Sequence, residues 1–240
     1  MGAGDRNVSS TEVAGESVDL AKTSVRELNQ RLHDVDRAAP GRWRVSNPNG
    51  AHSVAVGLDA EVEVEIDGHV GYYGAGMNKL ATVRVLGNAG PGVAENIMSG
   101  TVIVEGDASQ YAAASGRGGL VVIRGSASAR CGISMKGVEI VVGGSIGHVG
   151  GFMAQRGTLV VCGDAGEGLG DSIYETRVYV RGEVAGLGAD CIEKDMRDEH
   201  RSELGELLRR AEVDADPGDF RRYGSARRLY TFDVDHAGAY

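Results

Sequence analysis

The chain has 240 residues, enough for one domain with appendages, and 38 of them are glycine beside only 4 prolines. That composition, with 42% hydrophobic residues, excludes collagen-like and disordered chains and indicates a folded protein with many tight corners. The net charge of −9 disfavours nucleic acid as the main partner, because phosphate binding depends on a surplus of lysine and arginine.

The N-terminal segment, residues 1–49, is predicted to be an arm that precedes the repeated part of the chain. Its first residues, MGAGDRNVSS, contain no apolar signal core. No stretch of the whole sequence reaches the ~18 apolar residues that a membrane span needs. We therefore expect a cytoplasmic protein with no membrane partner.

One helix is predicted within this arm, over residues 23–34. Its apolar residues recur at helical spacing: Val25, Leu28 and Leu32. Thr23 or Ser24 serves as the N-cap, and Glu27 stands three residues after Ser24, as in a capping box.

Residues 50–195 repeat one pattern at a constant interval of nineteen residues. Each repeat has a short β-branched run closed by a glycine, and seven closing glycines stand in phase: Gly68, Gly87, Gly106, Gly125, Gly144, Gly163 and Gly182. Four and two residues before the glycine the side chain is always apolar, the period of two that turns alternate strand residues to one face. The residue after the glycine is always polar, so we expect it to face water.

Two further columns of the repeat accept only small side chains. Glycine, serine or alanine stands three residues after the closing glycine, and glycine or alanine stands seven after it. Such columns are typical of stacked corners, where the backbone takes positive φ or passes too close to the next layer for a side chain. Ten residues after the glycine an inner wall is predicted, interrupted by Asn78 and Gly116, from the following residues: Ile97, Met135, Ile173 and Ile192.

One short strand in every nineteen residues leaves no room for a helix between strands, which excludes alternating βα units. The pattern predicts an all-β fold, a right-handed parallel β-helix (solenoid) of about seven 19-residue turns. An antiparallel sandwich or propeller is disfavoured, because Asn-Gly hairpin signals are absent between the runs.

Residues 196–240 are predicted to form a C-terminal helix followed by a tail rich in arginine and tyrosine. Over residues 194–213 apolar residues recur at helical spacing between an acidic start and a basic end. Because the end strands of a solenoid are exposed edges, this helix and the N-terminal one are predicted to be caps or docking arms. The tail, 220–235, is expected to lie along the rod as a strand or loop, with arginine stems over tyrosine rings.

No motif predicts a catalytic, cofactor-binding or metal site on this chain. The glycine-rich loops at 74–81, 144–151 and 163–170 match no phosphate-binding pattern, and the repeat already accounts for them. The six histidines lack the spacing of zinc ligands, and no serine or cysteine has an evident partner base.

The three cysteines fall in different columns of the repeat. They are Cys131, Cys162 and Cys191, an odd number with no CxxC pair. We interpret them as small buried apolar residues of a protein from a reducing compartment.

Two sets of residues are predicted to dock a partner. Between the inward positions of successive strands lies an outward apolar stripe, which the tail or a partner subunit should cover: Val122, Val141, Val160 and Tyr179. The first coil carries larger side chains where other coils have mostly small ones: Tyr72, Tyr73, Met77 and Asn78. Two interpretations stay open for them, docking of a partner and filling of the core at the end of the rod.

The segments GSIGHVGG and GDAGEGLG share a Gly-xx-Gly-xxx-Gly spacing, at 144/147/151 and 163/166/170. This repetition resembles the GXGXG domain that closes the large subunit of glutamate synthase and is also a chain of formylmethanofuran dehydrogenase. The resemblance covers about residues 50–195, and the other coils depart from it by serine or alanine at the second glycine and alanine at the third.

The whole chain is most similar to the stand-alone middle subunit of three-subunit glutamate-synthase-like enzymes such as N-methylglutamate synthase. SVRELNQRLH, NPNGAHSVAVGL, GHVGYYGAGMN and FRRYGSARRLYTF carry this similarity. It implies a non-catalytic scaffold in a hetero-oligomer with a class II amidotransferase-like subunit and an FMN-binding synthase subunit. FMN, and optionally an iron–sulfur cluster, then belong to the partners, with no cofactor on this chain.

The reaction implied is the formation of N-methylglutamate and ammonia from glutamate and methylamine. A subunit of an ordinary glutamate synthase would have the same appearance. A self-contained β-helix enzyme needs clustered carboxylates or a paired histidine, which the outward columns do not show. A plain structural module would oligomerise through the apolar stripe.

Overall fold

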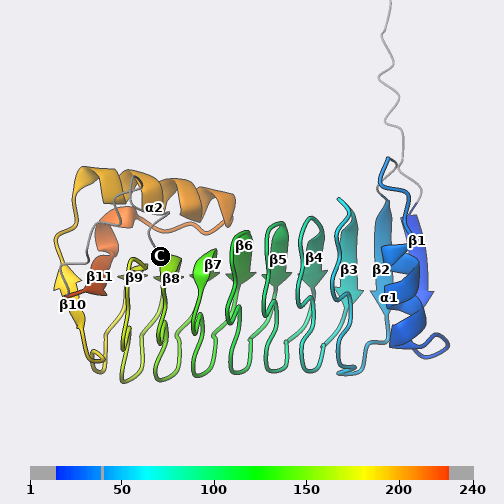
Figure 1. Cartoon of the computed structure of the whole chain (residues 1–240), viewed down its shortest axis with the longest axis horizontal. Coiled ribbons are helices and arrows are strands. Elements are labelled where there is room, and N and C mark those ends of the chain that lie inside the picture. The colour runs from blue at the N-terminus through cyan, green and yellow to red at the C-terminus, as the bar shows by residue number, and fades with distance from the viewer. Residues whose placement is uncertain (1–14, 39–40, 227–240) are drawn as a thin grey trace, which may run out of the picture.

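The strands of the computed structural model, which describes residues 15–38 and 41–226, form one 11-stranded sheet in the order β1-β2-β3-β4-β5-β6-β7-β8-β9-β11-β10 (Figure 1). The helices are α1 (Val25–His33), α2 (Asp198–Arg210) and the 3-10 turn η1 (Pro217–Asp219). The strands are β1 (Gly15–Asp19), β2 (Arg42–Ser46), β3 (Glu63–Asp67), β4 (Thr82–Val85), β5 (Thr101–Val104), β6 (Leu120–Ile123), β7 (Lys136–Val142), β8 (Arg156–Val161), β9 (Arg177–Val180), β10 (Cys191–Lys194) and β11 (Arg221–Ser225).

Pairing is parallel from β1 to β9, which confirms the solenoid and overturns the antiparallel alternatives. Residues nineteen apart pair directly, as Val64 does with Val83 and Val83 with Val102, so like residues stack on like. The seven repeated runs are β3 to β9. The structure adds β1 and β2 to this stack, so the coil begins before residue 50.

From Gly87 to Gly182, the closing glycines recur because a polar side chain from the preceding coil occupies the space of their Cβ. A Cβ on Gly163 would lie 2.5 Å from Ser145 Oγ, and one on Gly87 2.6 Å from His69 Nδ1. These side chains follow the closing glycines and form a ladder. Each accepts a hydrogen bond from the backbone N–H nineteen residues later, at 2.7 to 3.1 Å: His69, Asn88, Asp107, Ser126, Ser145 and Asp164.

Both predicted explanations of the small columns are correct, one for each column. Seven residues after the closing glycine the backbone is left-handed, as at Ala75 (φ 52°) and Gly151 (φ 66°). Three residues after it the coils approach closely where the residue is glycine, since a Cβ on Gly90 would lie 2.6 Å from Gly71 C. Other coils admit a small side chain in this column, as at Ser109.

Left-handed backbone also occurs five and nine residues after the closing glycine, on either side of the column at seven. Side chains larger than alanine stand at some of these positions. Tyr73 (φ 62°), Ala75 and Met77 (φ 53°) show this alternation in one coil. Hydrogen bonds to neighbouring coils hold the strained residues, including Tyr73 N–H to Pro91 O at 2.9 Å and Met77 N–H to Glu95 O at 2.8 Å.

The inner wall is formed as predicted by Ile97, Met135 and Ile173, all fully or almost fully buried. Ile192 was expected to continue it, but its side chain is 42% exposed. The reason is that β10 leaves the coil and pairs antiparallel with β11, which inserts between β9 and β10.

The two ends of the coil are covered by different elements. At the N-terminal end, α1 begins after the Ser24 cap, whose side chain accepts from Glu27 N–H, and buries Leu28 and Leu32 against the core. Asn29 holds it to the first corner with hydrogen bonds to Ser53 O (2.8 Å) and from Ala55 N–H (2.9 Å). At the other end lie β11 and β10, so the tail begins as a strand, while residues 227–235 of that prediction lie outside the described residues.

Neither helix within the described ranges, α1 or α2, has the length and apolar character required to cross a bilayer.

Replacing a closing glycine should destabilise the fold. Gly163→Ala forces a methyl group against Ser145 Oγ and the backbone of Gly144, and such overpacking costs about 1–3 kcal/mol. Urea unfolding should show this loss, whereas Ser109→Ala, in a column that already admits side chains, should change stability by less than about 0.5 kcal/mol. Equal midpoints for the two variants would contradict the close-approach explanation.

Candidate functional site

The predicted apolar stripe is covered by the chain itself. Val141 and Val160 are fully buried and Val122 and Tyr179 are 1% exposed, in a second hydrophobic cluster separate from the core. The covering residues come from α2, the segment after it and the start of the tail: Leu204, Leu207, Leu208, Ala211 and Phe220. The stripe is covered as expected, but mainly by α2 rather than by the tail or a partner subunit, so the prediction that these four residues dock a partner is wrong.

Ion pairs and hydrogen bonds fix α2 along the outer face of β6 to β9, where Figure 1 shows it running lengthwise. Arg210 lies 2.7 Å from Glu139 on β7, and Arg177 on β9 pairs with Glu203. Arg124 on the loop after β6 donates to Ala211 O at 2.6 Å and Glu212 O at 3.0 Å. α2 starts at Asp198, later than predicted, because β10 continues to Lys194.

A small cavity of about 240 Å³ lies between α2 and the sheet, lined in part by Tyr179 and its charged neighbours Glu139 and Arg177. The Tyr179 hydroxyl has no hydrogen-bond partner among the described residues, and burial raises its pKa. The charged residues around it pair with one another. The cavity is therefore part of the helix–sheet packing.

The first-coil residues lie partly on the surface. Tyr72 is 50% exposed and packs beside Tyr73, with ring centroids 5.6 Å apart. The Tyr73 hydroxyl accepts a hydrogen bond from Asn96 Nδ2 at 3.2 Å, and Met77 is exposed. Asn78 is fully buried, with Nδ2 donating to Ala81 O at 2.7 Å, so it offers no surface to a partner.

A hollow of about 580 Å³ lies over the outer face of β1 to β4. Its side chains alternate in charge from strand to strand, and Arg42 Nε lies 2.7 Å from Glu63 Oε2. Arg44 pairs with Glu65 at 3.8 Å. Because its carboxylates are held by arginines, the hollow lacks the free carboxylate pair that glycoside cleavage uses.

The three cysteines are free and buried, as predicted. Burial raises the pKa of Cys131 to about 12 and that of Cys191 to about 11, and it also raises the pKa of Cys162. Such thiols stay protonated and are poor nucleophiles. None of the glycine-rich loops at 74–81, 144–151 and 163–170 opens a helix, as predicted, because strands and turns follow them.

Comparison with known proteins identifies a near relative. Protein GlxC of Rhizobium meliloti (strain 1021) is 60% identical over 225 residues, which span 93% of this chain and 99% of the relative. The chain belongs to the GlxC family. No family model matches the sequence.

The fold of this GlxC-family chain also occurs in a solved complex. A chain of the formyltransferase/hydrolase complex (FhcABCD) from Methylorubrum extorquens, determined with methylofuran, superposes with a TM-score of 0.54. The match covers 87% of this chain and 90% of that chain at 20% identity, which establishes a shared fold.

Across the described parts of this GlxC-family chain, no cluster of three or more His, Cys, Asp and Glu side chains is suited to hold a metal ion. Many polar groups of the repeat are used in the ladder, as Asp107 is, or in ion pairs, as Glu139 is with Arg210. What the surface offers is a set of exposed large apolar side chains on the corners of the coil: Tyr72, Met77, Leu80, Met98, Met153 and Tyr174.

Truncating a residue of α2 should destabilise the whole fold, because α2 seals the stripe. Leu204→Ala removes a side chain that is 1% exposed, and a buried Leu→Ala change costs about 2–5 kcal/mol. Arg201→Ala, on the exposed side of the same helix, should cost less than about 0.5 kcal/mol. Unchanged unfolding of Leu204→Ala would mean that α2 is separable from the coil.

Alkaline pH should weaken the fold through Cys131. Its thiol ionises near pH 9.0 when exposed but near 12 in the folded chain, so the unfolded state releases a proton first and stability falls as pH rises from 9 towards 12. The slope from one such thiol is about 1.4 kcal/mol per pH unit. Urea unfolding from pH 8.5 to 10.5 should show a smaller decline for Cys131→Ala than for the unaltered chain, and parallel declines would contradict this assignment.

Proposed function

We propose that this chain is a non-catalytic scaffold subunit of a cytoplasmic, multi-subunit enzyme of the glutamate-synthase type. In this proposal it links a class II amidotransferase-like subunit to an FMN-binding synthase subunit. FMN, and an iron–sulfur cluster if the enzyme uses one, are bound by those partners.

The observation that carries the proposal is how the chain uses its polar groups. Side chains that perform chemistry elsewhere have structural partners here: Asp107 and Ser145 accept ladder hydrogen bonds, Glu63 pairs with Arg42, and Cys131 is buried. At the same time large apolar side chains stand exposed in a monomer of high net charge, and such side chains are typical of interaction surfaces.

The solved complex gives independent support for a scaffold role. There a chain of the same fold is part of a formyltransferase/hydrolase assembly, and this chain spans 90% of it. The repeated Gly-xx-Gly-xxx-Gly spacing of residues 144–170 favours the glutamate-synthase type, through its resemblance to the GXGXG domain.

A stack of parallel coils suits this task physically. Interstrand hydrogen bonds along the rod resist bending and hold two attached active sites at a constant separation. A reactive amine or ammonia released at one site then reaches the other before it escapes to solvent. We propose the synthesis of N-methylglutamate from glutamate and methylamine, with an ordinary glutamate synthase as the alternative reaction.

The first test is a tagged purification from the native host under non-denaturing conditions, followed by absorbance spectroscopy and mass spectrometry. We expect a yellow complex that contains, in fixed ratio, a flavin protein and an amidotransferase-like chain. A colourless chain that elutes without partners would overturn the proposal.

The purified complex also decides between the two reactions. Glutamate with methylamine should yield N-methylglutamate and ammonia. Omitting methylamine should abolish the formation of N-methylglutamate. If instead glutamine and 2-oxoglutarate, supplied with a two-electron reductant, give two molecules of glutamate, the complex is an ordinary glutamate synthase.

A further inference from the structure

One edge of the solenoid carries a column of basic side chains without partners. We call it the basic edge: Lys79, Arg117, Lys136 and Arg156. All four are exposed, and none makes a side-chain hydrogen bond or ion pair with any residue that the structure describes. By contrast, arginines on the outer sheet face have carboxylate partners, as Arg84 has Glu105.

Backbone hydrogen bonds establish that these residues are stacked. Met98, which stands above Lys79, donates its N–H to Asn78 O at 2.8 Å, and the N–H of Arg117 donates to Ile97 O at 2.7 Å. Lys136 N–H donates to Gly116 O at 2.7 Å, one coil further along. Lys136 and Arg156 are then direct neighbours in the parallel pairing of β7 and β8.

This arrangement is unfavourable in the isolated chain. Neighbouring strands lie about 4.8 Å apart, and like charges directly opposite each other in a sheet repel. Glu175 follows Arg156 in the same stack, since its N–H donates to Gln155 O at 2.8 Å, and it lines a hollow with Lys136 and Arg156. It nevertheless forms no ion pair with either of them within the described chain. A surface that brings carboxylates to this edge would remove the repulsion.

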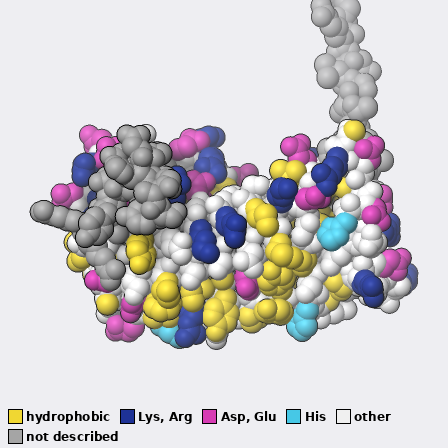
Figure 2. All heavy atoms as spheres, viewed as in Figure 1, with side chains coloured by type: hydrophobic (Ala, Val, Ile, Leu, Met, Phe, Trp, Pro, Cys, Tyr) yellow, Lys and Arg dark blue, Asp and Glu magenta, His cyan; other side chains and the backbone are white. Residues whose placement is uncertain are grey.

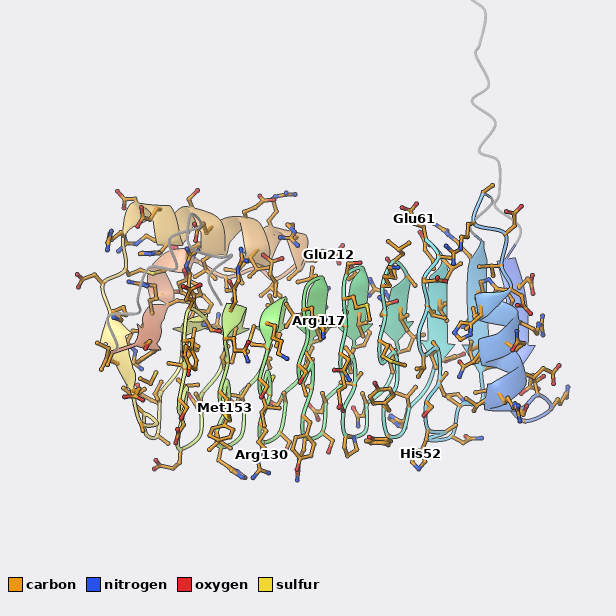
Figure 3. All side chains as sticks on the ribbon, in the orientation of Figure 1. His52, Glu61, Arg117, Arg130, Met153 and Glu212 are labelled. Carbon is orange, nitrogen blue, oxygen red and sulfur yellow. The ribbon has the colours of Figure 1, made fainter. Side chains whose placement is uncertain are left out.

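Exposed apolar side chains accompany the charges. Met98 stands within the column and is 45% exposed. Met153 lies next to the part of the column formed by Lys136 and Arg156, and it is 47% exposed. Met153 lines a hollow of about 530 Å³ together with Lys136, Arg156 and Tyr174. Figure 2 shows basic and hydrophobic side chains side by side on this face, and Figure 3 places Arg117 over the middle of the coil stack, with Met153 lower on the same face.

We propose that the basic edge is the docking surface for an acidic face of a partner subunit. This proposal rests on the proposed function and specifies where the scaffold holds one of its partners. Methionine and arginine are enriched in protein interfaces, and flexible methionines fill irregular gaps. The net charge of −9 and the methionines among the cations favour a protein over a nucleic acid.

Charge reversal tests the proposal in the complete complex. The double variant Arg117→Glu/Lys136→Glu should recover at least about tenfold less of one identified subunit than the unaltered chain, because like charges across an interface repel. The matched control is Lys22→Glu/Arg26→Glu, which makes the same charge change on exposed residues at the N-terminal end. It should recover that subunit at the unaltered level, and thermal unfolding should show that both variants fold.

Zero-length carbodiimide cross-linking supplies a second readout, because it joins lysine only to a carboxylate that it contacts. The sequence has four lysines: Lys22, Lys79, Lys136 and Lys194. We expect Lys79 and Lys136 to link to aspartate or glutamate of the partner, whereas Lys22, which lies 3.5 Å from Asp19 of its own chain, and Lys194 should form no link to the partner.

The outcomes separate the two proposals. If the complex forms but survives the reversal, or links only through Lys22 or Lys194, the docking surface is wrong and the scaffold role stands. Recovery of nucleic acid on the edge instead of an acidic subunit also overturns the docking surface. If the unaltered chain binds no subunit at all, the scaffold role fails, and the docking surface fails with it.

Discussion

The rest of the structure depends on the hydrogen-bonded stacking of one coil on the next. Backbone groups pair along the strands, and the ladder of His69, Asn88, Asp107, Ser126, Ser145 and Asp164 satisfies one further N–H in each coil. Each ladder side chain occupies the space in front of the next closing glycine. The constant interval of nineteen therefore follows from a physical requirement that each coil imposes on the next one.

Because like positions stack from coil to coil, the surface is divided into regions of different character. On the outer sheet face, the first strands carry charges that pair with one another, as Arg42 does with Glu63. The later strands carry the apolar stripe, and α2 covers it with Leu204, Leu207 and Leu208. On the corners, Met98 is exposed to solvent, and the charge of Arg117 has no carboxylate partner within the described chain. A scaffold needs this division, because its interior must be rigid while part of its surface stays available.

The chain matches a GlxC protein over nearly its whole length, and a chain of the same fold occurs in a formyltransferase/hydrolase complex. The thiols are buried and the ladder side chains are engaged in hydrogen bonds, so the proposed function depends on the contacts that the chain makes with partner subunits. The corners of the coil, rather than its outer sheet face, are where those contacts should be sought.

The sequence by itself determined the strand column, the two small columns, a helix cap at Thr23 or Ser24 and the buried cysteines, because each depends on residues one coil or one helical turn apart. It did not place α2 on the stripe, where Arg124 contacts Ala211 across 87 positions of sequence, nor β11 between β9 and β10. Those contacts depend on where the chain turns after the last coil. Only the tertiary structure decided that Ile192 is exposed, that Asn78 is buried, and that the four stripe residues are already occupied.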